Sequence, residues 1–356
     1  MSEVRSSSVT VRFYNIFSVA PIVVGAVVLL SLIILFLFYE LLFDRYQLFW
    51  SAAENGTVLR NFRITIIHCL LIAYAPTAYV YVIRTSRRTL DELVPVLDYT
   101  NAELSEIRAA VGQYDWWKLS LLTLLALLAV IQITRATTPA FENPWSIASM
   151  TPEVLWHRVT GPIMACWTTC FVYAVVAESH RLRGIASRVS TIDLLDLKPL
   201  KPFSHQALTN SLLILAYMAV VSLFSLEEGF GQVVIRNWFF AVIFALASLL
   251  LPVVGVRDRI RKEKLKEFEW CRIALQRARA ELKTEPDADR SMSQNSSDGQ
   301  HVPLAEAAAY QHVIEGVREW PFDSSTVVRF AIYLLIPLGS WFGGAMVERL
   351  VDSWLG

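Results

Sequence analysis

The sequence predicts an all-α protein: a polytopic membrane helix bundle of seven spans with a helical layer on the cytosolic side. Composition is the first observation behind this prediction. Of the 356 residues, 54% are hydrophobic and only 18% are charged, against about 25% charged in soluble proteins. The 32 basic residues balance the 32 acidic ones, so the net charge indicates no nucleic-acid partner. The partner that this composition predicts is the lipid bilayer.

Seven apolar runs are the second observation. Each is about long enough to cross 30 Å of hydrocarbon as a helix. The predicted spans are 18–43, 64–83, 119–138, 159–177, 206–226, 238–256 and 326–347. The first run is longer than the apolar core of about 7–15 residues in a secretory signal, so we expect it to remain in the protein as an anchor.

The distribution of Lys and Arg is the third observation. The N-terminal tail and the segments after spans 2, 4 and 6 hold 25 of the 32 basic residues. Basic residues collect in cytosolic loops. We therefore expect a multi-pass protein of the plasma (inner) membrane with its N-terminus in the cytosol and, because the number of spans is odd, its C-terminus outside.

The cytosolic segment 84–118 is predicted to be helical. Apolar residues recur there every seven positions: Leu90, Leu97, Leu104 and Val111. Pro95 interrupts this pattern, and Thr100 with Glu103 has the spacing of a capping box that starts a new helix. We expect two short amphipathic helices that pack under the six-span region 1–256.

The segment 257–322 is predicted to form a cytosolic helical arm. Residues 257–284 contain strong helix formers and neither Pro nor Gly, so span 6 is expected to continue into this helix with a stripe of Leu265, Phe268, Leu275 and Leu282. Residues 285–303 have the composition of a disordered hinge. A second amphipathic helix over 304–318 follows, and Asp323 or Ser324 is expected to cap the last span in the unit 323–356.

The last span carries the residues that we select for packing or gating. Pro337 removes one backbone hydrogen bond and is expected to bend the helix. Gly339 and Gly343 form a small-xxx-small pair, and Ser340 and Gly344 form a second one. Such pairs let membrane helices approach closely. They predict either ordinary packing within the bundle or a contact between copies of the chain.

A cavity between spans 2, 4 and 7 is predicted from His68, Tyr74, Pro76 and Pro162, because kinked helices with aromatic side chains often frame one. His68 could also meet Cys69, His157 and Cys166 in a metal or haem site near the outer surface. This spacing matches no known site, and a hydrogen-bonded structural histidine is the alternative. We predict no metal and no cofactor.

Motifs for enzymatic chemistry are missing from the sequence, including the phosphate-binding G-x-x-x-x-G-K-[ST] and the zinc-binding H-E-x-x-H. Ionisable residues lie near span ends and not in span centres, where proton-coupled transport would place them. We therefore do not expect an enzyme. The layout, with seven spans and a long cytosolic arm before the last, resembles that of insect chemoreceptor channels.

Three classes of function follow. The first is a channel- or receptor-like protein that forms a homo-oligomer through span 7. The second is a membrane scaffold or signalling component that binds a cytosolic protein partner through 257–322. A transporter or membrane enzyme is the third, ranked last because charged groups are missing from the span centres.

Overall fold

The structure is a computed structural model that describes residues 20–42, 57–137, 152–190, 192–225, 232–284, 304–339, 342–343 and 346–347. Within these ranges the chain is helical and has no β-strand, apart from one isolated antiparallel bridge between Leu97 and Val189. The predicted all-α class is therefore confirmed for the part of the chain that the structure describes.

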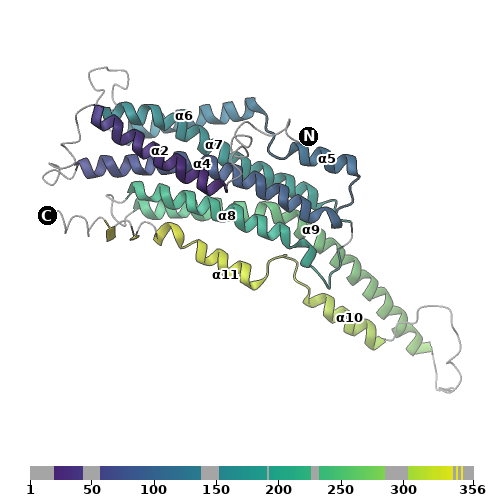
Figure 1. The fold of residues 1–356 in the computed structure, drawn as a ribbon. Coiled ribbons are helices and arrows are strands. Elements are labelled where there is room, and N and C mark those ends of the chain that lie inside the picture. Colours follow the sequence, from purple (N-terminus) through teal and green to yellow (C-terminus); the bar gives the residue numbers. More distant parts are fainter. Residues whose placement is uncertain are drawn as a thin grey trace.

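Six long helices run side by side (Figure 1). They are α2 (Pro21–Leu42), α4 (Thr57–Leu93), α6 (Trp116–Thr137), α7 (Pro152–Ala186), α8 (Lys201–Ser222) and α9 (Gln232–Thr284). Three shorter helices complete the described fold: α5 (Asn101–Ala110), α10 (Leu304–Gly316) and α11 (Ser324–Tyr333).

Five of the described helices are long and apolar enough to cross a membrane. They cover Pro21–Leu42, Phe62–Val96, Leu155–Ala186, Lys198–Ser222 and Trp238–Ala280. They correspond to predicted spans 1, 2, 4, 5 and 6. The helices at predicted spans 3 and 7 have shorter described apolar stretches, Trp116–Leu128 and Ser325–Gly339.

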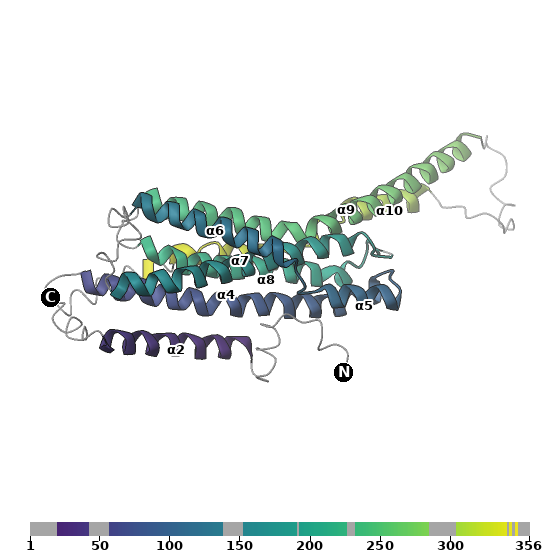
Figure 2. The ribbon, with the colours of Figure 1, turned by 90° about the horizontal axis from the view of Figure 1, so that it is seen from above.

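The core lies among α4, α7, α8 and α9. Its largest fully buried side chains include Phe171, Phe203, Ile83 and Ile260. Helix α2 packs along the side of α4 and stands apart from the others when the bundle is seen from above (Figure 2). Most large apolar side chains of α2 and of the described part of α6 are exposed, as expected for surfaces that face lipid.

Helix α4 is longer than the predicted span, since it continues to Leu93 before a 3-10 turn at Val94–Val96 that contains Pro95. The first of the two expected amphipathic helices is therefore the end of α4. The second is confirmed as α5. The Thr100 hydroxyl accepts a hydrogen bond from the Glu103 amide at 3.3 Å, and the Thr100 amide donates to the Glu103 carboxylate at 2.8 Å.

Helix α9 is a single helix of 53 residues, as predicted for span 6 and the segment after it. Its second half leaves the bundle and pairs with α10 to form the arm (Figures 1 and 2). The predicted apolar stripe is wrong at Leu265, whose side chain is 58% exposed. Ile260, Cys271 and Ala278 are buried instead.

Helix α11 begins at the predicted cap, because the Asp323 carboxylate accepts from the Thr326 amide at 3.1 Å. It ends at Tyr333, four residues before Pro337. Proline has no amide hydrogen for the carbonyl of the residue four positions earlier. The Trp238 indole donates to the Leu334 carbonyl at 3.2 Å, and the Ser222 hydroxyl to the Pro337 carbonyl at 3.3 Å. These bonds hold the broken helix against α8 and α9.

Candidate functional site

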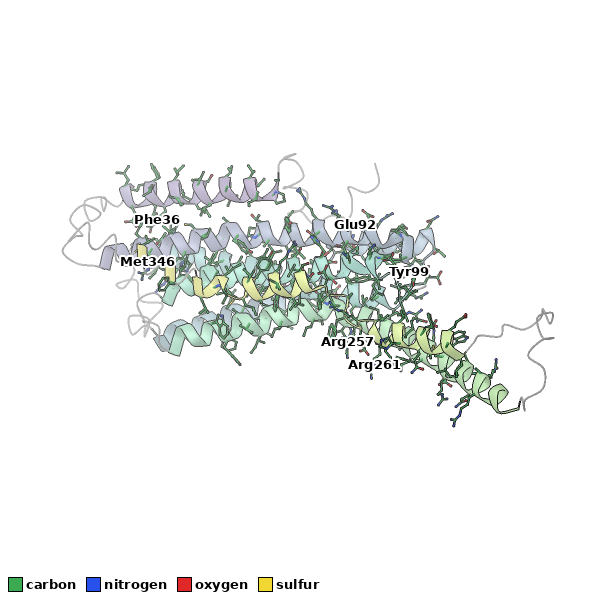
Figure 3. All side chains as sticks on the ribbon, turned by 90° about the horizontal axis from the view of Figure 1, so that it is seen from below. Phe36, Glu92, Tyr99, Arg257, Arg261 and Met346 are labelled. Atoms are coloured by element: carbon green, nitrogen blue, oxygen red, sulfur yellow. The ribbon has the colours of Figure 1, made fainter. Side chains whose placement is uncertain are left out.

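Several segments of the described chain contact α9 at the point where it leaves the bundle. Helix α9 crosses α7 closely at Gly255, where an added Cβ would lie 2.5 Å from the Arg183 carbonyl oxygen. A side chain at position 255 would therefore push the two helices apart. Arg257 and Arg261 mark the start of the arm in Figure 3.

Two arginines of α9 bind other parts of the same chain at this junction. Arg257 lies over the Trp320 ring at 4.8 Å and within 3.8 Å of the Glu319 carboxylate. The guanidinium of Arg259 donates to the Val189 carbonyl at 3.3 Å. These contacts tie the start of the arm to the segment before α11 and to the loop after α7.

Lys264 fixes α10 in the same way. Its ammonium donates to the carbonyls of Glu315 at 3.0 Å and Val317 at 2.8 Å, at the C-terminus of α10, where free carbonyls and the helix dipole favour a cation. The Tyr310 hydroxyl also donates to the Glu267 carboxylate at 3.2 Å. In the same stretch of α9, Arg261 and Lys262 have no partner in the described structure.

The loops below α4 and α7 pair with each other and support this junction. The Asp98 amide donates to the Arg188 carbonyl at 2.9 Å, and the Ser190 amide donates to the Val96 carbonyl at 3.0 Å. This pairing places the Val189 carbonyl where Arg259 reaches it. The segment 84–118, expected beneath the bundle, thus contains the end of α4, a loop that pairs with the loop after α7, and α5.

Glu178 is the one fully buried carboxylate among the largest buried side chains of the described core, with 1% of its surface exposed. It accepts hydrogen bonds from the Gly112 amide at 3.0 Å, the Tyr114 hydroxyl at 2.8 Å and Arg181 at 2.5 Å. Burial and the neighbouring carboxylate raise the pKa of Tyr114, so Tyr114 remains a protonated donor. Glu178 thereby fixes the turn before α6 to α7.

A buried polar chain joins α4, α8 and α7 close to this end of the bundle. The Thr89 hydroxyl donates to the Gln206 side-chain carbonyl at 3.1 Å, and the Gln206 side-chain amide donates to the Asn210 side-chain carbonyl at 2.9 Å. The Asn210 amide then donates to the Ser179 hydroxyl at 3.0 Å. Because these groups satisfy one another, the chain fixes the relative positions of the three helices.

The residues predicted to frame a cavity lie on two neighbouring helices, with His68, Tyr74 and Pro76 on α4 and Pro162 on α7. The Tyr74 hydroxyl donates to the Leu213 carbonyl of α8 at 2.8 Å, and its ring packs against Phe171 and Tyr217. Pro76 is buried, whereas Pro162 is exposed on α7. The seventh predicted span begins with α11, which packs on α8.

The structure describes three of the five residues selected in the last span. Pro337 is buried at the break after α11. An added Cβ at Gly339 or Gly343 would meet no atom within 4 Å, so neither glycine lies against another helix in the described part of the chain. Ser340 and Gly344 lie outside the described residues, and so does the predicted hinge 285–303.

The four residues considered for a metal site lie in three different surroundings. His68 and His157 come together, with ring centroids 4.7 Å apart. Cys69 instead packs with Phe36 and Trp156. Cys166 faces a groove between α6 and α7 that Cys170 also lines.

Sequence reasoning missed Gly112, Glu178 and Gly255. The signal at Gly255 was a glycine inside an otherwise strong helix, which commonly marks close packing. Nothing in the sequence near Glu178 indicates that a turn 64 residues away in the chain would supply its donors. Comparison of the chain with protein-family models, with curated proteins and with solved structures found no match.

Proposed function

We propose that the chain is a receptor-like protein of the plasma (inner) membrane that transmits changes in its bundle to a cytosolic arm. In this proposal it has seven spans, with α6 as the third and the region from α11 onward as the seventh. The N-terminus is cytosolic and the C-terminus is outside. The arm, formed by the second half of α9 and by α10, presents itself to a soluble protein partner.

The continuity of α9 is the observation that carries this proposal. One helix of 53 residues belongs to both the bundle and the arm. Arg257, Arg259 and Lys264 attach its exit to the neighbouring segments. A shift of α9 against α7 would therefore move the arm as a unit. Trp270 and Ile273 are 48% and 40% exposed on the arm, which supports a role in contacting a partner.

The proposal requires the arm to hold one orientation relative to the base of the bundle. We expect a narrow distance distribution between spin labels at Glu106→Cys on α5 and Arg279→Cys on the arm, in full-length protein in nanodiscs. Both positions are exposed. The four native cysteines are replaced by alanine for this measurement, which uses pulsed electron paramagnetic resonance.

Loss of the junction contacts should broaden that distribution. The double variant Arg259→Ala/Lys264→Ala removes hydrogen bonds to Val189, Glu315 and Val317. Lys262→Ala is the matched control, because Lys262 is exposed and has no partner in the described structure. A broad distance distribution between the two labels in protein whose junction residues are unchanged would contradict transmission through a rigid α9.

A second candidate function is a channel formed by a homo-oligomer through the seventh span. The unoccupied space beside Gly339 and Gly343 favours it, as do the exposed side chains of Phe342 and Met346. We expect Gly343→Leu to reduce the mass of the particle measured by mass photometry in a mild detergent. Gly184→Leu is the control, because Gly184 also has open space beside it but lies on α7. A monomeric wild type would exclude this candidate.

A transporter or membrane enzyme remains the third candidate. Most buried polar side chains of the described bundle are neutral, such as Thr160, Ser211 and Ser248, and the buried Glu178 lies close to the arm end and not in the middle of the spans. Charge-coupled transport usually places ionisable groups at this depth. No observation on the described residues favours this class over the other two.

A further inference from the structure

Two histidines from different helices meet at the end of the bundle opposite the arm. His68 lies near the start of α4 and His157 near the start of α7. Their ring centroids are 4.7 Å apart and their planes are inclined by 46°. The Phe224 ring contacts His68 edge-on at 5.1 Å. Both histidine side chains are partly buried.

The hydrogen bond of His68 determines which of its nitrogens can bind a ligand. Its Nδ1 lies 2.9 Å from the Ile64 carbonyl oxygen. A carbonyl can only accept, so Nδ1 carries the proton and Nε2 keeps its lone pair. Histidines that bind metals are commonly oriented in this way, with one ring nitrogen donating to a backbone carbonyl.

The spacing of the two rings fits a shared metal ion. A metal–nitrogen bond of about 2.0–2.1 Å and a further 1.1–1.2 Å or so to the ring centre place the ion about 3.2 Å from each centroid. Two imidazoles at an angle of about 90–110° on one ion then have centroids about 4.5–5.2 Å apart. The 4.7 Å separation lies within this range.

We propose that His68 and His157 form a two-histidine site for a divalent transition-metal ion that favours imidazole, such as Cu²⁺ or Zn²⁺. Each ring ligates through one nitrogen, and His68 keeps its hydrogen bond to the Ile64 carbonyl through Nδ1. Water occupies the remaining coordination positions, since the described residues contain no group of three or more His, Cys, Asp or Glu side chains that could hold a metal. The ion would link α4 to α7. This site does not depend on the proposed role of the arm.

Cu²⁺ is the probe that tests the site, because its paramagnetic resonance spectrum reports the nitrogens bound to it. The full-length protein is purified with a tag that contains no histidine and is titrated with Cu²⁺ in nanodiscs. We expect nitrogen couplings from two imidazoles in the wild type. We expect His68→Ala and His157→Ala each to lose this signal and to weaken Cu²⁺ binding by about tenfold or more. His180→Ala is the control, since His180 is an exposed histidine of α7 and should leave both unchanged.

A measurement on the wild type keeps the test valid if a variant does not fold. Diethyl pyrocarbonate modifies accessible imidazoles, and mass spectrometry locates the modified residues. Cu²⁺ should protect His68 and His157 together and leave His180 reactive. Equal modification of His68 and His157 with and without Cu²⁺ would overturn the proposal. An unchanged spectrum in both folded alanine variants would overturn it as well, and would show that the bound ion is adventitious.

Discussion

Glu178 shows how one buried side chain can hold several segments together at the end of the bundle that faces the arm. Its carboxylate is fully buried but accepts from a backbone amide, a phenol and a guanidinium. A buried carboxylate needs such donors, because leaving it unpaired costs several kcal/mol. The sequence places Glu178 near the end of a span, where a carboxylate could simply reach water. It could not indicate this burial, because the donors come from a distant turn.

Replacing Tyr114 tests this contact. Tyr114→Phe removes one donor from the buried carboxylate, and we expect it to lower the free energy of unfolding by about 1–3 kcal/mol. Tyr173→Phe is a matched control, because the Tyr173 ring lies 5.3 Å from that of Tyr114 but its hydroxyl has no hydrogen bond in the described structure. Thermal unfolding of both variants in detergent provides the comparison. Equal losses would mean that the hydrogen bond from Tyr114 to Glu178 contributes nothing to stability beyond the effect of removing a hydroxyl.

Glycines also separate what sequence can show from what it cannot. Gly112 has a φ of 81°, a left-handed conformation that costs other residues about 1–2 kcal/mol. Gly255 permits the close crossing of α9 and α7. Gly339 and Gly343, selected from their spacing, have open space beside them. The spacing of small residues predicts that a helix can be approached, but the neighbour is determined by the fold.

Helices were predictable where their signals are local. The capping box at Thr100, the Asp323 cap and the continuous α9 all follow from adjacent residues. The length of α4 was not predictable from local signals. Its last turns, where Leu90 and Leu93 are buried, continue the span instead of forming a separate short helix, and the residues that bury them come from other parts of the chain. The buried face of the arm was misplaced at Leu265 for a similar reason. The position of α10 determines that face, on which Cys271 and Ala278 are buried.

The cap of α11 should respond to acid. Hydrogen bonds from the Thr326 and Ser325 side chains and from the Thr326 amide lower the pKa of Asp323 from 3.8 to about 2. A group with a lowered folded-state pKa stabilises the fold above its unfolded pKa, and this contribution is lost as the pH falls through the folded pKa. We therefore expect the stability advantage of the wild type over Asp323→Asn to be complete above pH about 4 and to vanish near pH 2.

Thermal unfolding at a series of pH values measures this difference. Asparagine can still accept a hydrogen bond as a cap, so the variant isolates the charge. Asp91→Asn is the control, because Asp91 forms an exposed ion pair with Arg108. A pH-independent difference between wild type and Asp323→Asn would show that the cap contributes no proton linkage.

At the scale of the whole molecule, the membrane determines which predictions were within reach. The all-α class followed from the apolar runs, because only helices satisfy every backbone group within one segment in lipid. Five helices have the required length and composition. The predicted cavity and the predicted contact at Gly339 depend on which helices are neighbours. Hydropathy carries no information about that, since lipid-facing and protein-facing residues are similarly apolar.

The proposed orientation is tested at the two ends of the chain. We expect a reporter that is active only outside the cytosol to be active after Gly356 and inactive before Met1. The physical reason is the excess of Lys and Arg in the segments assigned to the cytosol. The same reporter inserted between Thr284 and Leu304, in the segment that joins α9 to α10, should be inactive as well. Activity there would reverse the assigned side of the arm.

The unbroken length of α9 has a consequence for whatever meets the far end of the arm. From Arg257 to Thr284 the helix rises by about 40 Å at 1.5 Å per residue, so its tip is held at a set height. The rotational position of the tip about the helix axis is fixed too. One inserted residue would rotate every side chain beyond it by about 100°, whereas seven inserted residues would return those side chains to within about 20° of their original direction. A protein that recognises the tip therefore meets it at one distance from the bundle and with one face of the helix turned toward it.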